Sequence, residues 1–223
     1  MTSSRLVASA AQVAAQIRDM ALNAGADLTP GQIRKLSDYW ALLASWNSVI
    51  NLTGFRLSMS DPDTRALDRL IIEPLRALPL FPPGPLAWFD LGSGGGSPAL
   101  PLKVVRQAAG LTMVESRSRK AAFLREAVRV MGLTSVTVLT QPVETVARHA
   151  SEVADVVTIR AVRGGKTFTR AAADLLRPGG LILWFGRGPA QIPFPLLCAQ
   201  IEVRPELRAD VQVLRKHAFH VER

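Results

Sequence analysis

A glycine-rich run between two acidic residues is the part of the sequence best suited to chemistry on a small ligand. Residues 90–97 read DLGSGGGS and directly follow the apolar stretch 86–89. Glycines let the backbone turn tightly and let a ligand lie against main-chain N–H groups. A second apolar stretch ends in Glu115, about 20 residues after the turn, where a carboxylate binds a ribose 2′-hydroxyl in nucleotide-binding folds. The order of strand, glycine turn and helix predicts a nucleotide-binding βα unit.

The details of this run discriminate between nucleotide ligands. The dinucleotide-binding pattern requires a third glycine where this chain has Ser97. Asp90 lies two residues before the first glycine and would repel a pyrophosphate, whereas it suits a ligand with an amino group. An acid followed by Gly92, Gly94 and Gly96 resembles the pattern of S-adenosylmethionine (SAM) methyltransferases, whose ligand carries a sulfonium and an α-amino group. A glycine-rich surface turn without a ligand is the alternative interpretation.

Alternating strands and helices after residue 85 would position these residues. Strands are expected at 86–90, 111–115, 135–139, 154–158 and 180–185, and helices near 97–107, 117–131, 143–150 and 167–176. A further antiparallel pair is expected at about 197–204 and 217–222. This alternation is typical of a mostly parallel, doubly wound sheet with helices on both faces. The expected fold class is therefore α/β and Rossmann-like.

The first 80 residues have a different, helical pattern. Apolar residues recur at helical spacing from Arg5 to Asn23, and residues 29–32 read TPGQ, which suits a capping box with proline at the first helical position. Asp61-Pro62 is expected to begin a third helix, which a proline-rich connector follows. We expect an N-terminal helical cap at 1–80 and a SAM-binding, Rossmann-like domain at 86–223.

The positive charge of the chain is concentrated in its second part. The formal net charge is +9, with 8 Lys/Arg against 7 Asp/Glu in residues 1–85 and 19 against 11 in residues 86–223. A positive field on the ligand-binding part favours a polyanionic partner such as nucleic acid. An acidic protein partner, or an arginine-rich codon preference, would give the same balance.

Cysteine content and hydropathy limit the class of protein further. Cys198 is the single cysteine, which excludes internal disulfides and a cysteine-rich zinc site. The sequence has neither a signal-peptide pattern nor an apolar run near the length of a membrane span. We therefore expect a soluble, cytoplasmic protein that does not bind membranes. We also expect a monomer.

Cations are concentrated where the second predicted helix of the α/β part begins. Arg117, Arg119 and Lys120 occupy its first turn, although the helix dipole disfavours positive charge there. Arg125 and Arg129 extend the same basic face. The placement favours contacts with RNA phosphates at the opening of the ligand site. A solvated surface helix is the alternative interpretation.

Other candidate residues follow the later strands, because ligands of open parallel sheets lie at the carboxyl ends of the strands. Val143 and Glu144 begin a helix, and their N–H groups could bind the edge of an adenine ring. The alternative for Glu144 is a carboxylate favoured by the helix dipole. Arg160 follows the fourth strand and could face the SAM carboxylate or the substrate. The alternative for Arg160 is a salt bridge at the end of the strand.

Several catalytic groups are missing from the sequence. It contains no N-P-P-Y tetrapeptide of amino-group methyltransferases, and Cys198 lies in an apolar run that suits a core residue. The histidines His149, His217 and His220 have no metal-binding spacing. Guanine N7 has an in-plane lone pair and carries no proton at neutral pH, so its methylation needs alignment and no general base. A basic methyltransferase without these groups is compatible with guanine N7 and with other neutral nucleophiles.

Several segments, taken in order and spacing, resemble one family. They are residues 46–47, 51–53 with Arg56, 90–98, 115–116 with 119–120 and 123–125, 143–144 and 160–161. The chain is similar to the bacterial small-subunit (16S) rRNA guanine-N7 methyltransferase G family, also called glucose-inhibited division protein B. The resemblance implies a class I SAM-dependent methyltransferase fold. It aligns the following residues with the family's SAM-binding positions: Gly92, Ser97, Val143, Glu144 and Arg160.

Three positions depart from the family pattern. Residues 69–74 read RLIIEP, and Leu70 stands where family members usually carry histidine. Ile159 replaces the serine that usually precedes the arginine, and Arg187 stands near a usual lysine after the fifth strand. These departures concern substrate contacts more than cofactor binding.

The resemblance and the residues together predict a SAM-dependent methyltransferase that acts on guanine N7 of 16S rRNA or the small ribosomal subunit. The expected cofactor residues are Asp90 and Gly92 to Gly96 with Ser97 at the methionine end, Glu115 at the ribose, Val143 and Glu144 at the adenine, and Arg160 at the boundary with the substrate. The expected RNA-binding residues are Arg117, Arg119, Lys120, Arg125 and Arg187. Four alternatives stay open: a methyltransferase of another RNA, one of a small molecule, a non-catalytic ribosome-assembly factor, and a nicotinamide dehydrogenase.

Overall fold

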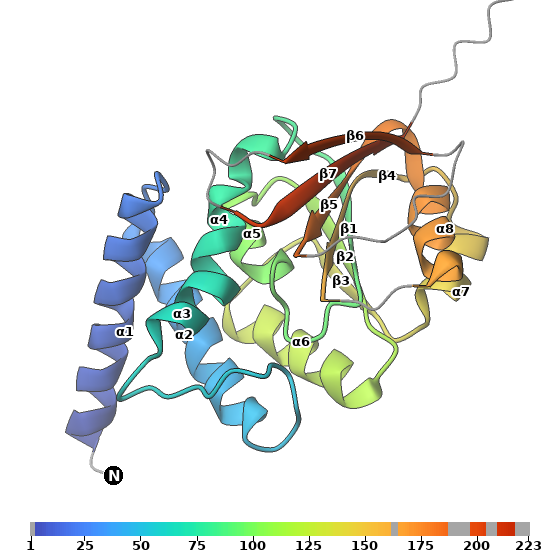
Figure 1. Cartoon of the computed structure of the whole chain (residues 1–223). Coiled ribbons are helices and arrows are strands. Elements are labelled where there is room, and N and C mark those ends of the chain that lie inside the picture. The colour runs from blue at the N-terminus through green and yellow to red at the C-terminus, as the bar shows by residue number, and fades with distance from the viewer. Residues whose placement is uncertain (1–2, 162–164, 187–196, 204–208, 217–223) are drawn as a thin grey trace, which may run out of the picture.

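A single mixed sheet forms the centre of the computed structural model, which describes residues 3–161, 165–186, 197–203 and 209–216 (Figure 1). The strand order is β3-β2-β1-β4-β5-β7-β6. The first five strands in this order, β3, β2, β1, β4 and β5, pair in parallel. Strand β7 runs antiparallel to β5, and β6 runs antiparallel to β7. The strands are β1 Ala87–Leu91, β2 Gly110–Val114, β3 Val136–Leu139, β4 Ala154–Arg160, β5 Leu176–Phe185, β6 Leu197–Val203 and β7 Val211–Lys216. The mostly parallel α/β sheet expected from the sequence is confirmed.

Helices cover both faces of the sheet, as the alternating sequence pattern requires. They are α5 Ala99–Val105, α6 Ser118–Val130, α7 Val143–His149 and α8 Lys166–Leu175. Successive residues of one strand point to opposite faces: Val156 of β4 belongs to one hydrophobic cluster and Val157 to another. Figure 1 shows α5 and α6 on one side of the sheet and α7 and α8 on the other. The doubly wound arrangement is confirmed.

The N-terminal helices pack on the face that α5 and α6 cover. They are α1 Ser3–Asn23, α2 Pro30–Asn47, α3 Thr64–Leu67, a π-helical turn Asp68–Ile72 (the π turn), α4 Glu73–Arg76 and a 3₁₀ turn Leu78–Leu80. The expected capping box is present, since the Thr29 Oγ1 accepts from the Gln32 N–H and the Gln32 side chain accepts from the Thr29 N–H. Trp46 of α2 packs edge-on against Phe123 of α6, with ring centroids 5.7 Å apart.

One hydrophobic core is shared by the helical cap and the sheet. It extends from Val13 and Ile17 of α1 through Trp40 of α2 to Trp88 of β1 and Val213 of β7. The boundary expected between residues 80 and 86 therefore marks a change of secondary structure within a continuous core. The division into two domains stays a prediction.

Three expected elements were misplaced. The third helix begins at Thr64, because the Asp63 carboxylate caps it by accepting the Arg65 N–H at 2.8 Å. The fifth strand begins at Leu176, and its pairing shifts register near Ala154, with the positive-φ Gly179 inside the strand. The partner of β6 is β7 Val211–Lys216, whereas residues 217–222 lie outside the described part of the chain.

Among the described residues, no helix combines the length and the apolarity needed to cross a membrane.

Candidate functional site

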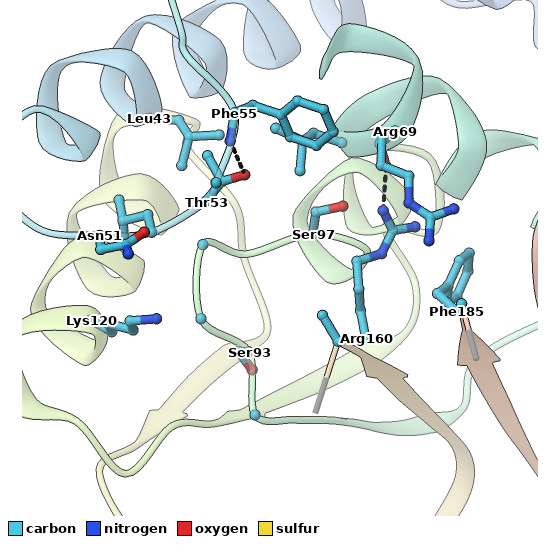
Figure 2. A pocket seen from close by; sticks show the side chains of 18 of the residues that line it. Leu43, Asn51, Thr53, Phe55, Arg69, Ser93, Ser97, Lys120, Arg160 and Phe185 are labelled. Atoms are coloured by element: carbon cyan, nitrogen blue, oxygen red, sulfur yellow. Dashed lines mark hydrogen bonds between the residues drawn. The ribbon is translucent and has the colours of Figure 1, made fainter. Parts of the chain in front are cut away.

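A cavity of about 740 Å³ lies between the carboxyl ends of the strands and the helical cap. Its sheet wall contains the glycine loop, defined as residues 92–97, with Arg117 and Lys120 beside it. Its cap wall contains residues of α2, of the π turn and of the cap loop, defined as residues 48–62. Figure 2 shows Ser93 and Ser97 of the glycine loop across the cavity from the labelled residues of the cap loop.

The glycine loop has a backbone that side chains would not tolerate. Gly92, Gly94 and Gly96 have φ of +71°, +51° and +88°, in the left-handed region that glycine enters at no steric cost. A Cβ on Gly96 would collide with the Leu100 side chain, and one on Gly95 would lie 3.2 Å from the Leu52 carbonyl of the cap loop. The cap therefore contacts the loop backbone directly, which explains the run of glycines.

Asp90 lies buried behind the glycine loop, with 1% of its surface exposed. Its Oδ1 accepts from the Thr158 hydroxyl at 2.6 Å, and Trp88 Nε1 donates to the same hydroxyl oxygen at 2.9 Å. Its Oδ2 is buried with no hydrogen-bond partner in the described part of the chain. Burial raises the pKa of Asp90 to about 6, although hydrogen bonds from Thr158 and Ser93 oppose the rise. A cationic ligand group would satisfy this carboxylate.

Glu115 holds the glycine loop through its carboxylate. Its Oε2 accepts from the Gly94 N–H and its Oε1 from the Arg117 N–H, both at 2.9 Å. The side chain is buried and does not line the cavity in this structure. The structure thus gives Glu115 a role in shaping the loop, and its contact with a ribose stays a prediction.

Arg160 lines the cavity and makes the buried salt bridge that the sequence left as an alternative. Its side chain is 9% exposed, and its NH2 lies 2.7 Å from Glu73 Oε2. Its NH1 donates to the Arg69 carbonyl, and its guanidinium lies 4.8 Å from the centroid of the Phe185 ring. Burial lowers the pKa of Arg160, and Glu73 counteracts this effect.

Glu73, Arg69 and Phe185 were not expected at the site from the sequence. Glu73 was noted only within the stretch that lacks the family histidine. The spacing of Arg69 and Glu73, four residues apart, is a signal for a helical ion pair. Nothing in the sequence indicates that this pair also reaches Arg160 on a strand 87 positions away from Glu73.

The cap loop is folded by one amide side chain at the end of α2. Asn47 Oδ1 accepts from the N–H groups of Leu52 and Thr53, both at 2.9 Å, and its Nδ2 donates to the Phe55 carbonyl at 3.2 Å. Asn51, Thr53 and Phe55 thereby line the cavity (Figure 2). The sequence indicated Asn51 and Thr53 by family resemblance alone and did not indicate Phe55. The three hydrogen bonds to the Asn47 side chain have no pattern in the sequence.

Comparison with known proteins assigns this arrangement to a family. The family model of rRNA small subunit methyltransferase G matches residues 32–189. The chain belongs to this family. The ribosomal RNA small subunit methyltransferase G of Roseiflexus sp. (strain RS-1) is 38% identical over 171 residues, which are 74% of this chain and 71% of that protein.

Two further comparisons give the range of similarity. The methyltransferase G of Stenotrophomonas maltophilia (strain K279a) is 36% identical over 175 residues, which are 78% of this chain and 76% of that protein. The crystal structure of a SAM-dependent methyltransferase from Aquifex aeolicus is 14% identical, with a TM-score of 0.48, over 69% of this chain and 93% of that chain. The strand order described above gives the class I methyltransferase fold of the family.

The expected RNA-binding cations of this family member differ in their environments. Arg117 and Lys120 line the cavity, and Arg119 is exposed on the same turn of α6. Arg125 instead donates to the Val138 carbonyl at 3.2 Å and to Thr140 Oγ1 at 2.6 Å. Arg187 lies outside the described residues. All five stay predictions as RNA contacts, and Arg125 has a structural role besides.

The two residues expected at the adenine lie at the start of α7. Val143 is buried in the core between the sheet and the helices α7 and α8, and Glu144 is half-buried. Neither lines the cavity in this structure. Their contact with a cofactor stays a prediction.

The chemistry of the cavity lining is that of a positioning site. None of its described lining residues carries a carboxylate, an imidazole or a thiol. Tyr39 is fully buried, donates to the Gly95 carbonyl at 2.7 Å, and has its pKa raised by that burial. In the described ranges, no group of histidine, cysteine and acidic side chains could hold a metal ion. These lining groups can bind and orient a substrate, and they provide no general base.

Proposed function

We propose that this chain transfers a methyl group from SAM to N7 of a guanine in the 16S rRNA of the small ribosomal subunit. The observation that carries the proposal is one cavity that joins the glycine loop to a cationic opening and is lined, in the described residues, by no general base. Membership of the methyltransferase G family supports the same reaction. We further propose that the chain acts as a monomer in the cytoplasm.

The residues at the glycine loop fit SAM. The buried, unpartnered Oδ2 of Asp90 would bind the α-amino group, and the unpartnered hydroxyl of Ser97 offers a second polar contact. The backbone of Gly92 to Gly96 would hold the methionine end, with Glu115 assigned to the ribose. The adenine is assigned to Val143 and Glu144, and the boundary with the substrate to Arg160. SAM bound there would supply an electrophilic methyl group on its sulfonium.

The cap wall would position the target base. A guanine that enters the cavity must leave its stack, and polar and aromatic side chains then hold the exposed base. Asn51, Thr53 and Phe55 provide such groups on the cap loop. Because N7 presents a lone pair and no proton, the chain needs to align the base and to exclude water, without removing a proton.

The opening of the cavity would bind the RNA backbone. Arg119 and Lys120 lie on the first turn of α6, and Arg117 directly precedes it; Arg117 and Lys120 line the cavity with the glycine loop. None of these three side chains makes an ion pair with the part of the chain that the structure describes. Unpaired cations can neutralise phosphates, which gives affinity that depends on salt.

The test is methyl transfer from radiolabelled SAM to 30S subunits purified from a strain that lacks the family enzyme. Digestion of the RNA and nucleoside analysis should give 7-methylguanosine from 16S rRNA. Large (50S) ribosomal subunits serve as the negative control and should not be methylated. Absence of transfer, with SAM binding shown by calorimetry, would overturn the substrate assignment and leave the cofactor assignment in place.

A further inference from the structure

Arg160 is held in its place by two contacts from the helical cap. The Glu73 carboxylate of α4 lies against NH2, and the Arg69 carbonyl of the π turn accepts from NH1. The Phe185 ring covers the face of the guanidinium. Figure 2 shows Arg69, Arg160 and Phe185 together at one side of the cavity. The rotamer of Arg160 is therefore fixed by groups outside its own strand.

The carboxylate of Glu73 balances a small cluster of charges. Its Oε1 accepts from Arg69 NH1 and from the Asp210 N–H at 3.1 Å, and Arg69 NH2 lies 3.5 Å from Asp210 Oδ2. The cluster thus contains two cations and two anions. Without Glu73, the half-exposed Arg69 cation would face the buried Arg160 cation with no carboxylate between them, which would favour rotation of Arg160 toward solvent.

One donor of Arg160 is left for a ligand. Its Nε is buried and has no hydrogen-bond partner in the described residues, although the side chain lines the cavity. A buried N–H without an acceptor is costly, and a ligand acceptor in the cavity would remove that cost. The guanidinium is thus satisfied at NH1 and NH2 and unsatisfied at Nε.

We propose that Glu73 is a positioning residue: it fixes the Arg160 guanidinium so that the Nε–H stays available to the ligands of the methyl-transfer site. The inference rests on the proposed function and extends it to the cap, since Glu73 reaches the site only through Arg160. The Arg69 carbonyl assists Glu73 in this role, and it lies on a π turn, a type of turn that is frequent at functional sites.

A purely structural role for Glu73 is the competing explanation. Glu73 also binds the Asp210 N–H, so it ties α4 to the segment before β7. Its loss would lower the thermal stability under either explanation. The two differ in whether the loss depends on Arg160.

A double-mutant cycle distinguishes them. Glu73→Gln keeps the shape and removes the charge, and we expect kcat on 30S subunits to fall by about 10²-fold, as for a misplaced catalytic-site group. In the Arg160→Ala background, Glu73→Gln should change kcat by no more than about twofold. SAM affinity, measured by calorimetry, should follow the same cycle. Glu73→Gln should lower it approximately tenfold when Arg160 is present and should leave it unchanged in the Arg160→Ala background.

The matched control lies on the same π turn. Asp68 pairs with Arg76, with the closest atoms 2.5 Å apart, and does not contact Arg160 in the described structure. Asp68→Asn should lower the melting temperature and leave kcat within about twofold of the unsubstituted chain.

The possible outcomes are separable. Equal losses of kcat from Glu73→Gln in both backgrounds, or no loss in either, would overturn the inference and leave the proposed function intact. If the unsubstituted chain does not methylate 30S subunits, the proposed function fails. The calorimetric cycle with SAM then decides the role of Glu73 by the same criterion.

Discussion

The two walls of the cavity are built in different ways. The sheet wall presents backbone atoms of the glycine loop, which Glu115 and the end of β2 hold from nearby positions of the same βα unit. The cap wall presents side chains from separate elements, which Asn47 and Tyr39 hold in place, and the Arg160–Glu73 pair joins the two walls. A wall of backbone suits a constant cofactor, and a wall of side chains suits a particular substrate. Changes in the two walls should therefore have separable effects.

The largest effect is expected on the sheet wall. Gly94 has φ +51° and lines the cavity, so Gly94→Arg would place a long side chain in the proposed cofactor site. We expect a loss of SAM affinity of more than about 10²-fold, measured by calorimetry.

Gly84→Arg is the control for this change. Gly84 has φ +80° in an exposed turn away from the cavity, with nothing within 4 Å of its would-be Cβ. The Gly84→Arg variant has a similar backbone strain and does not fill the cavity, so its SAM affinity should stay near that of the unsubstituted chain. Tight SAM binding by Gly94→Arg would remove the glycine loop from the cofactor site.

The second effect concerns the charge of Asp90. Because burial raises its pKa to about 6, Asp90 is ionised at neutral pH and becomes protonated as the pH falls through about 6. The neutral acid no longer attracts an amino group, so SAM affinity should fall on the acid side with a midpoint near pH 6.

Asp90→Asn should abolish this pH dependence and weaken SAM binding by about 10- to 100-fold, the effect of one hydrogen bond to a charged group. Calorimetric titrations between about pH 5 and 8 measure both properties. The same midpoint in the Asn variant would assign the titration to another group.

The third effect is on the cap wall. Asn47→Ala removes three hydrogen bonds that fold the cap loop, which should lower the free energy of unfolding by about 1–3 kcal/mol. We expect kcat to fall about tenfold, because the cap loop would no longer hold the base in line, while SAM affinity changes by less than about threefold. Thermal unfolding, calorimetry and single-turnover transfer measure the three quantities. Equal losses of SAM affinity and of kcat would mean that the two walls do not act separately.

The smallest effect is expected at the opening. Arg119→Ala with Lys120→Ala should weaken RNA binding severalfold at moderate salt and reduce the slope of log affinity against log salt by about 1 to 2. Filter binding over a series of salt concentrations gives the slope. Arg148→Ala with Arg170→Ala removes the same charge from the helices α7 and α8 and should leave the slope unchanged. Equal slopes for both pairs would show that α6 does not contact phosphates.

The same contrast explains what the sequence could predict. The sheet wall lies within residues 90–120, so strand, glycine turn and acid could be recognised together, and the α/β sheet followed from the alternating pattern. The cap wall depends on contacts between distant segments. A carboxylate at Glu73 that pairs with Arg160, or an amide at Asn47 that folds a loop, has no local signature.

The predicted boundaries of helices and strands were wrong where one side chain or one strand pairing sets them. The third helix begins after Asp63 because that carboxylate caps it, although Asp61-Pro62 has the same residue types for a helix start. The antiparallel partner of β6 was placed too late in the chain, since two short apolar stretches competed and only the pairing with β5 selects Val211–Lys216. The sequence predicts a basic surface for RNA at the start of α6, and it could not show that Arg125 binds the Val138 carbonyl.

The most direct test of the central claim is the 16S rRNA of a bacterial strain that lacks its own family enzyme and expresses this chain. Mass analysis of rRNA fragments should show one additional methyl group on a single guanine, identified as 7-methylguanosine, and the Gly94→Arg variant should show none. An unmethylated 16S rRNA in cells that contain the folded chain, or a methyl group at another atom, would contradict the account.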